Sequence, residues 1–207
     1  AMAFMNKRTF LLWILFLTTI FAGFGQVVQK QPSRVEIKDF EKITSSQWTG
    51  KRVAFLGDSM TQPSKDGSNC IYWEYLAEML GIEPFVYGIS GHQWDGIYRQ
   101  ALKLNAEKGN AVDAILIFAG TNDYNHSLPL GEFFSETTRE TNHNGKTVVR
   151  KYRTPILNDS TFCGRINKVI SYLRANYPEQ QIVIMTPLHR GFAKFSNTNV
   201  QPEESYA

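Results

Sequence analysis

The chain contains short, continuous runs of apolar residues, and segments with helical periodicity separate these runs. Val53–Leu56 (VAFL) ends at Gly57, and residues 112–119 (VDAILIFA) end at Gly120. Runs this short, with almost no polar interruption, are typical of strands that are buried on both faces of a sheet. Because helical segments lie between the runs, the sequence predicts a mostly parallel α/β sheet with helices on both faces.

Seven segments fit this alternation of strand and helix. We predict strands at 53–56, 84–87, 112–119 and 181–185, and helices at 72–80, 94–104 and within 160–176. The helix at 72–80 is followed directly by Gly81, and a glycine at that position is a common signal for a helix C-terminus. In such sheets, side chains that do chemistry lie at the carboxyl ends of the strands.

The length of 207 residues allows one domain of ordinary size with short additions. We assign the domain to residues 51–207 and interpret residues 26–50, which are polar and irregular, as a lead-in segment. Residues 125–159 are rich in Thr, Asn and charged residues, and this composition predicts a surface insertion. A small hairpin is expected within it, around Asn144 and Gly145.

Residues 1–25 have the three-part pattern of a secretory signal peptide. Lys7 and Arg8 precede the apolar run Phe10–Ala22, and a stretch with two glycines follows at 23–25. A retained membrane anchor is the alternative, but the run is too short to span a hydrocarbon core of about 30 Å at about 1.5 Å per residue. We therefore expect a secreted or periplasmic protein without stable membrane association after cleavage.

Charge and cysteine content argue against several classes of partner. Of the 22 basic residues, Lys7 and Arg8 lie in the predicted leader, so the rest nearly balance the 19 acidic residues. This balance leaves no basic stripe for nucleic acid, and no nucleic-acid partner is expected. Cys70 and Cys163 have no His or Cys neighbours at metal-ligand spacing, so neither a metal nor another cofactor is expected. Whether the two cysteines pair is left open.

Three polar signatures follow three successive predicted strands, at the edge where chemistry is expected. They are GDSMT at 57–61, GISGH at 88–92 and GTND at 120–123. Ser59 begins a turn after a buried strand, and this position suits a nucleophile. The Gly91 backbone N–H and the Asn122 side chain are suited to stabilise a developing oxyanion. Each signature alone is also explained by ordinary turns and helix caps, but three at successive strand ends favour a catalytic site.

Together the three signatures resemble those of the GDSL or SGNH hydrolases, a superfamily of serine esterases, lipases and carbohydrate deacetylases. The resemblance covers roughly residues 51–190. It implies a flavodoxin-like, three-layer α/β/α fold without a cofactor. It also implies that Ser59 is the nucleophile, and that the Ser59 N–H, the Gly91 N–H and the Asn122 side chain form the oxyanion hole. Asp58 and Asp123 are further candidates for the substrate pocket.

The fourth signature of that family, an Asp-x-x-His near the C-terminus that supplies the general base, has no clear counterpart here. The pattern occurs once, at 123–126, where it overlaps the third signature, so His126 is not expected to be the base. His189, after the last predicted strand, is the other candidate and a possible pocket residue. His92 and His143 are interpreted as pocket or surface residues.

The end of the sequence suggests an incomplete domain. Residues 201–207 resemble the first turn of a helix, and neither a fifth strand nor a final helix is predicted after 181–185. We therefore expect the catalytic Asp and His beyond Ala207 and a chain that is inactive or weakly active by itself.

The predicted function is that of a secreted serine esterase or acylhydrolase, which cleaves an ester or O-acetyl group through an acyl-serine intermediate. Its substrate is a small-molecule or polysaccharide ester. The aromatic residues Tyr72, Trp73, Tyr75 and Trp94 slightly favour a carbohydrate deacetylase, although such residues more often fill the core.

Three alternatives compete with this function. A glycan-binding pseudoenzyme of the same fold remains open. A receiver-like or flavodoxin-like domain has little support, because it gives the Asn122 loop no role. Ser90 is disfavoured as the nucleophile because residues 88–92 do not match Gly-x-Ser-x-Gly.

Overall fold

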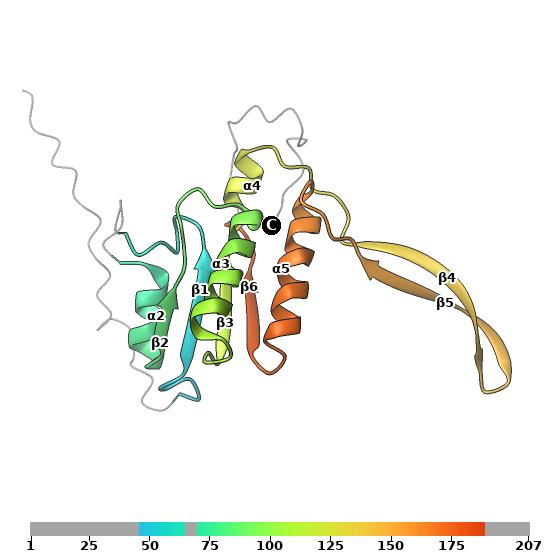
Figure 1. Ribbon diagram of the computed structural model, residues 1–207, viewed down its shortest axis with the longest axis horizontal. Helices are drawn as coiled ribbons and strands as arrows, with labels where there is room; N and C mark the ends of the chain where they lie inside the picture. Colours follow the sequence, from blue (N-terminus) through green and yellow to red (C-terminus); the bar gives the residue numbers. More distant parts are fainter. Residues whose placement is uncertain (1–45, 65–69, 189–207) are drawn as a thin grey trace, which may run out of the picture. The chain divides into compact units, whose positions relative to one another are not determined.

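A parallel sheet of four strands forms the centre of the computed structural model, which describes residues 46–64 and 70–188 (Figure 1). Its strands are β1 (Arg52–Gly57), β2 (Glu83–Val86), β3 (Ala114–Phe118) and β6 (Gln181–Met185). They lie in the order β2-β1-β3-β6, and every neighbouring pair is parallel. The predicted α/β class is confirmed, with each strand within two residues of its predicted bounds.

Helices cover both faces of this sheet and give the predicted three layers. They are α2 (Tyr72–Leu80), α3 (Trp94–Lys108) and α5 (Phe162–Asn176), whereas the short helix α4 (Thr121–Asn125) follows β3 at the carboxyl edge (Figure 1). Along β1, Ala54 and Leu56 pack in one core cluster with residues of α3 and α5. Val53 and Phe55 point to the other face and pack in a second cluster with residues of α2. The apolar run is therefore continuous because both of its faces are buried.

Local signals account for where the helices begin and end. Helix α2 spans the predicted residues, and Gly81 ends it in the left-handed region at φ 68°. Helix α5 begins after Thr161, whose side-chain oxygen accepts a hydrogen bond from the Gly164 N–H. Helix α4 has only five residues and was not predicted as a separate element.

The insertion at 125–159 contains a long antiparallel hairpin of β4 (Phe134–His143) and β5 (Lys146–Pro155). Asn144 and Gly145 form its turn with φ 52° and 77°, as a two-residue hairpin turn requires. The hairpin is confirmed, but its ten-residue strands make it longer than the small hairpin expected.

The base of the hairpin is held by a hydrogen bond between its two chain segments and by two hydrogen bonds from α5. The Ile156 N–H donates to the Phe133 carbonyl at 3.0 Å. The Asn167 side chain donates to the Phe133 carbonyl at 2.7 Å and to the Ile156 carbonyl at 3.0 Å. One buried amide on α5 therefore binds both chain segments where they leave the domain.

Several predictions concern residues that the structure does not describe. The predicted signal peptide at 1–25, most of the lead-in segment, His189 and residues 201–207 lie outside the described residues. Between residues 46 and 188, apart from 65–69, no helix is long and apolar enough to cross a membrane. Cys163 is a buried free thiol, so it forms no disulfide with Cys70 in this structure.

Candidate functional site

The strand order places the ends of β1, β2 and β3 side by side at the carboxyl edge of the sheet (Figure 1). The chain moves from β1 to β2 on one side and then returns to β3 on the other side of β1. In doubly wound sheets a crevice forms at such a reversal of strand order. The loops with Ser59, Gly91 and Asn122 follow β1, β2 and β3 respectively, so all three predicted catalytic residues belong to this edge.

The loop with Ser59 is a tight turn built on the preceding acid. The Asp58 carbonyl accepts hydrogen bonds from the N–H groups of Thr61 and Gln62, each at 3.0 Å. The Asp58 Oδ1 atom accepts another from the Met60 N–H at 3.0 Å. Asp58 itself is 1% exposed, whereas Ser59 is exposed. The turn thus leaves Ser59 at the surface and buries the residue before it.

Two aromatic side chains of α2 anchor this turn through Thr61. The Thr61 Oγ1 atom lies 3.1 Å from the Tyr72 hydroxyl, and the Trp73 indole donates to the Thr61 carbonyl at 2.9 Å. The space around Thr61 also requires glycine at two neighbouring positions. A Cβ on Gly57 would lie 2.6 Å from the Phe118 carbonyl oxygen, and a Cβ on Gly88 would lie 2.6 Å from the Thr61 backbone.

Two hydrogen bonds join the loop after β2 to the turn that carries Ser59. The Ile89 N–H donates to the Gly57 carbonyl at 3.1 Å. The Ser90 N–H donates to the Gln62 side chain at 2.5 Å. Gly91 follows with φ 77°, a conformation that favours glycine. The backbone conformation explains this glycine, because a Cβ built on it would meet no atom within 4 Å.

Gln100 of α3 joins β1 to the same loop from inside the protein. Its side chain accepts from the Gly57 N–H at 2.9 Å and donates to the Gly57 carbonyl at 2.8 Å. Its amide nitrogen also lies 2.9 Å from the His92 Nδ1 atom. With 2% exposure, Gln100 fixes the end of β1 and the His92 ring from the buried side.

Asn122 and Asp123 connect the third loop to the second. The Asn122 side chain donates to the His92 carbonyl at 3.0 Å. Both carboxylate oxygens of Asp123 accept from the Trp94 N–H, at 3.2 and 3.1 Å, at the start of α3. Arg165 of α5 lies 3.2 Å from one of these oxygens. The structure therefore links the three predicted loops in one hydrogen-bonded assembly.

Within residues 46–64 and 70–188, three N–H groups of this assembly have a hydrogen without an acceptor. Among the described residues, the backbone N–H groups of Ser59 and Gly91 donate to no other group. The Asn122 amide uses one hydrogen on the His92 carbonyl and retains the second. These are the donors that the sequence predicted for an oxyanion hole.

The described histidines are engaged elsewhere or lie apart from Ser59. His92 contacts Gln100, and the His126 Nδ1 atom lies 2.7 Å from the Asn122 carbonyl oxygen. His143 is the exposed last residue of β4. Burial, with a smaller effect of Arg99, lowers the pKa of His92 and favours the neutral ring. Within the described ranges, therefore, no histidine is hydrogen-bonded to the Ser59 hydroxyl.

Comparison with known proteins gives a decisive family match. Residues 55–205 match the GDSL-like Lipase/Acylhydrolase family. This chain belongs to that family. The matched region includes all three signatures as well as the hairpin insertion. A search of curated proteins found no match.

Several solved structures resemble this GDSL-family chain. A possible lipase from Chitinophaga pinensis is 23% identical, with a TM-score of 0.48 over 67% of this chain and 49% of its own. A protein from Lactobacillus plantarum is 24% identical, with a TM-score of 0.46 over 66% of this chain and 55% of its own. An acetylxylan esterase from Geobacillus stearothermophilus, solved as a catalytic mutant, is 17% identical, with a TM-score of 0.42 over 67% and 60%. The chain thus spans about half the length of the first two.

The two acids that were predicted to line the substrate pocket of this GDSL-family chain are both buried. Asp123 is 0% exposed, and its carboxylate is occupied by the Trp94 N–H and by Arg165. Burial raises the pKa of Asp123 to about 6. Burial also raises the pKa of Asp58, whose Oδ2 atom has no hydrogen-bond partner among the described residues. These positions support a role in holding the loops in place, whereas the third pocket candidate, His189, is not described.

The sequence did not reveal the interior polar residues, one buried and one half-buried, that connect the loops of this site. Arg165 gave no signal, because an arginine in the first turn of a predicted helix is ordinary. Gln100 gave a weak signal, because it interrupts the apolar stripe formed by Ile97, Ala101 and Leu104. A polar residue on a buried stripe needs a buried partner, and here the partner is the end of β1.

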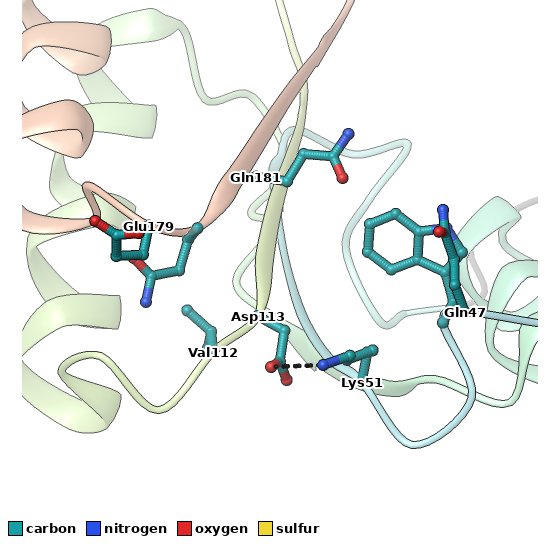
Figure 2. Close-up of a pocket in the computed structure, with 8 residues that line it drawn as sticks. Gln47, Lys51, Val112, Asp113, Glu179 and Gln181 are labelled. Atoms are coloured by element: carbon teal, nitrogen blue, oxygen red, sulfur yellow. Dashed lines mark ion pairs between the residues drawn. The ribbon is translucent and has the colours of Figure 1, made fainter.

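A hollow of about 430 Å³ lies at the other edge of the sheet in this GDSL-family domain (Figure 2). Lys51, Asp113 and Gln181 line it, at the amino ends of β1, β3 and β6. The Lys51 ammonium pairs with the Asp113 carboxylate at 3.5 Å. Because chemistry in parallel α/β sheets occurs at the carboxyl ends, this hollow is separate from the candidate site. No cluster of three or more potential metal ligands occurs within the described residues.

Proposed function

We propose that the protein is a serine esterase or acylhydrolase that uses Ser59 as its nucleophile. One observation carries the proposal. An exposed serine at the sheet reversal is linked through its loop to the N–H groups of Ser59, Gly91 and Asn122, each of which has a hydrogen without an acceptor among the described residues. Such donors stabilise the oxyanion of a tetrahedral intermediate. Membership of the GDSL-like lipase/acylhydrolase family supports the same reaction class.

In the proposed reaction, the Ser59 oxygen attacks the ester carbonyl carbon while a general base takes the hydroxyl proton. The carbonyl oxygen becomes an oxyanion and accepts hydrogen bonds from the three N–H groups. The bond to the leaving alcohol then breaks, and the alcohol takes the proton from the base. Water, activated by the same base, hydrolyses the acyl-serine, releases the acid and restores the Ser59 hydroxyl.

The proposed general base is a histidine outside the described residues. Of the described histidines, His92 and His126 contact other groups and His143 lies at the tip of the hairpin. His189 is the candidate in the rest of this sequence. Without such a base, the Ser59 hydroxyl is essentially un-ionised and acylation is slow.

The proposed setting is an exported protein that acts on an ester or O-acetyl group. Its support is the signal-peptide pattern at residues 1–25. The aromatic residues that favoured a carbohydrate give no support in the structure. Trp94 is 1% exposed, and Tyr72 and Trp73 of α2 are partly buried and pack against the core. These three aromatic side chains are therefore not a surface on which a sugar ring could stack.

Hydrolysis of p-nitrophenyl acetate and labelling by a fluorophosphonate probe test the nucleophile. Ser59→Ala should abolish labelling and lower hydrolysis by several orders of magnitude relative to the unmodified chain. Ser90→Ala is the matched control, because Ser90 is an exposed serine in the neighbouring loop, and its rate should be unchanged. His189→Ala should lower the labelling rate if His189 is the base. Activity of Ser59→Ala within about threefold of the parent would overturn the proposal.

A binding protein without catalysis is the second candidate function. It is favoured by the lack of a hydrogen bond between Ser59 and any described histidine. Under this alternative, the probe would label Ser59 no faster than it labels Ser90, and Ser59→Ala would leave ligand affinity intact.

A further inference from the structure

The register of the β4–β5 hairpin sorts its charged residues onto two different faces. Residues directly opposite one another in a hairpin share a face, and the face alternates along each strand. The pairs Glu136↔Arg153, Thr138↔Lys151 and Glu140↔Val149 therefore lie on one side, which we call the balanced face. The pairs Thr137↔Tyr152, Arg139↔Arg150 and His143↔Lys146 lie on the other side, which we call the cationic face.

On the balanced face, acidic and basic side chains are equal in number and form ion pairs with one another. Its acidic residues are Glu136 and Glu140, and its basic residues are Lys151 and Arg153. The Glu136 carboxylate pairs with Arg153 at 2.8 Å and with Lys151 at 3.5 Å. These two ion pairs hold the pKa of Glu136 below its usual range. This face offers little net charge to a partner.

The cationic face carries three permanent positive charges and no acidic residue. Arg139 and Arg150 lie directly opposite one another, an arrangement that destabilises a hairpin. Within the described part of the chain, neither they nor Lys146 form an ion pair. The Arg139 guanidinium instead lies 5.3 Å from the centre of the Tyr152 ring. An anion between the two arginines would turn this repulsion into attraction.

The hairpin is also exposed in a way that leaves room for a partner. Nine of ten residues in each strand are exposed, and Arg139, Arg150, Lys146 and Tyr152 are among them. An isolated two-stranded hairpin is at best marginally stable in water, so binding to such a surface adds stability to it.

We propose that the cationic face of the β4–β5 hairpin binds an acidic polysaccharide, the polymer that carries the ester cleaved at Ser59. The last clause rests on the proposed function, whereas the binding does not. Arginine pairs readily with carboxylates such as those of uronic acids. The Tyr152 ring and the Thr137 hydroxyl on the same face suit the apolar face and the hydroxyls of a sugar ring. The surface thus offers arginines for the carboxylate of an acidic sugar, an aromatic ring for its apolar face and a hydroxyl for its hydroxyl groups.

Spacing on the cationic face favours a polymer over a single small anion. The Arg139↔Arg150 pair and the His143↔Lys146 pair are four residues apart along the strands, or about 13 Å at about 3.3 Å per residue. Tyr152 lies two residues from Arg150 in the opposite direction, about 7 Å away. One small anion cannot reach all three positions, but several successive sugars of a chain can.

Nucleic acid is the less favoured polyanion for this surface. A protein that neutralises only about three phosphates gains little affinity at physiological salt, because the affinity depends on the number of phosphates contacted.

Affinity electrophoresis of the whole protein in gels with polygalacturonate tests the binding. The variant Arg139→Ser with Arg150→Ser removes two charges from the cationic face. The matched control, Lys151→Ser with Arg153→Ser, removes two charges from the balanced face of the same hairpin. We expect the first variant to weaken polygalacturonate binding at least tenfold and the control to weaken it less than threefold. Neutral xylan should not retard any of the proteins, and circular dichroism verifies that each variant folds.

Three results would overturn the proposal. Equal losses in the two variants would show that only net charge matters. Equal retardation by neutral xylan would remove the role of the carboxylates. Binding to duplex DNA that is tighter than to polygalacturonate, and lost in the same variant, would assign the face to nucleic acid.

Catalytic measurements separate failure of this inference from failure of the proposed function. Ser59→Ala should bind polygalacturonate as the parent does, because the hairpin is remote in sequence from the turn that carries Ser59. The cationic-face variant should hydrolyse p-nitrophenyl acetate normally but lose activity on O-acetylated polygalacturonate. Binding without any hydrolysis would refute the proposed function alone, and Ser59-dependent hydrolysis without binding would refute this inference alone.

Discussion

Asn122 has two tasks at the residue scale, because its amide carries two hydrogens. One hydrogen bonds the His92 carbonyl and fixes the side chain, and the other is available to an oxyanion. The residue next to it, Asp123, is committed to the Trp94 N–H and to Arg165 in the interior. In the proposed mechanism, adjacent residues of one short helix thus have different roles, Asn122 as an oxyanion donor and Asp123 as a support for the loops.

Replacing Asn122 by Ala should reduce kcat for p-nitrophenyl acetate by roughly 10²–10³, which is about 3–4 kcal/mol of transition-state stabilisation. KM should change much less, because the lost hydrogen bond strengthens only as the oxyanion forms. Steady-state kinetics over a range of ester concentrations separate the two constants. A change confined to KM would instead make Asn122 a substrate-binding residue.

Asp123 should make the protein less stable as the pH rises from about 4 to about 6. Its pKa is raised from the model-compound value of 3.8 to about 6, so in this interval the folded state holds a proton that the unfolded state has lost. Raising the pH therefore favours unfolding, by up to about 3 kcal/mol for a shift of this size.

Urea unfolding at intervals of half a pH unit measures this contribution. Asp123→Asn cannot titrate and should remove this slope between pH 4 and pH 6 while other groups continue to contribute. If the slope is the same in Asp123→Asn and in the parent, the buried carboxyl group is not its source.

At the scale of elements, α3 does more than cover the sheet. Its apolar stripe packs on β1 and β3, and Gln100 in that stripe binds both backbone groups of Gly57. The Ser59 turn begins one residue later, so the position of α3 determines the position of the turn.

Gln100→Leu should lower the free energy of unfolding by about 1–3 kcal/mol, because it leaves the buried Gly57 N–H without an acceptor. It should also lower the hydrolysis rate, because the turn that carries Ser59 loses its support. The control is Arg99→Leu, one residue away on the exposed side of α3, which should change the free energy by less than about 1 kcal/mol. Denaturant unfolding of the two variants provides the comparison, and equal effects would contradict the role given to Gln100.

Elements with a strong internal period were predictable from the sequence. The apolar run at 53–56 is continuous because both of its faces are buried, and the apolar residues at 72–80 recur at helical spacing because one face packs on the sheet. The sequence therefore predicts β1 and α2 close to their observed bounds. Helix α4 was not found, because five residues are too few to show a helical period. The length of the hairpin was underestimated for the opposite reason. With both faces in water, β4 and β5 have no alternation of apolar and polar residues.

The candidate site was predictable only in part, for a related reason. The loops at Ser59, Gly91 and Asn122 follow strands, and strand order places them at one edge by general rules. Their hydrogen bonds to Gln100, Thr61 and Arg165 depend on distances between elements, which no local pattern encodes. The charge sorting of the hairpin depends on register, so the near balance of acids and bases concealed a cationic face.

At the scale of the whole molecule, the four-stranded sheet and the β4–β5 hairpin are stabilised separately. The sheet is held by two apolar clusters on its faces. The hairpin pairs only β4 with β5, and its base is bound by Asn167. Removal of the hairpin should therefore leave the sheet intact.

Replacing residues 134–155 by Asn-Gly should shift Tm by less than about 4 °C, which corresponds to about 1 kcal/mol for a domain of this size. The deletion is geometrically allowed, because the flanking Phe133 carbonyl and Ile156 N–H are already 3.0 Å apart. Calorimetry compares the two proteins. Asn167→Ala in the full chain is the contrasting variant, since it removes one of the two donors to the Phe133 carbonyl and the donor to the Ile156 carbonyl, and it should lower Tm more. A deletion that unfolds the protein would show that the sheet depends on the hairpin.

The exposure of both hairpin faces also has a consequence for motion. The amides of β1 are bonded to strands on both sides and lie beneath helices, so they meet solvent water only when the whole domain opens. The amides between β4 and β5 need only the hairpin to fray, a local event that requires far less free energy. In deuterium oxide the two sets should exchange on separate timescales. A chain bound along the cationic face would slow the faster set and leave the slower set unchanged.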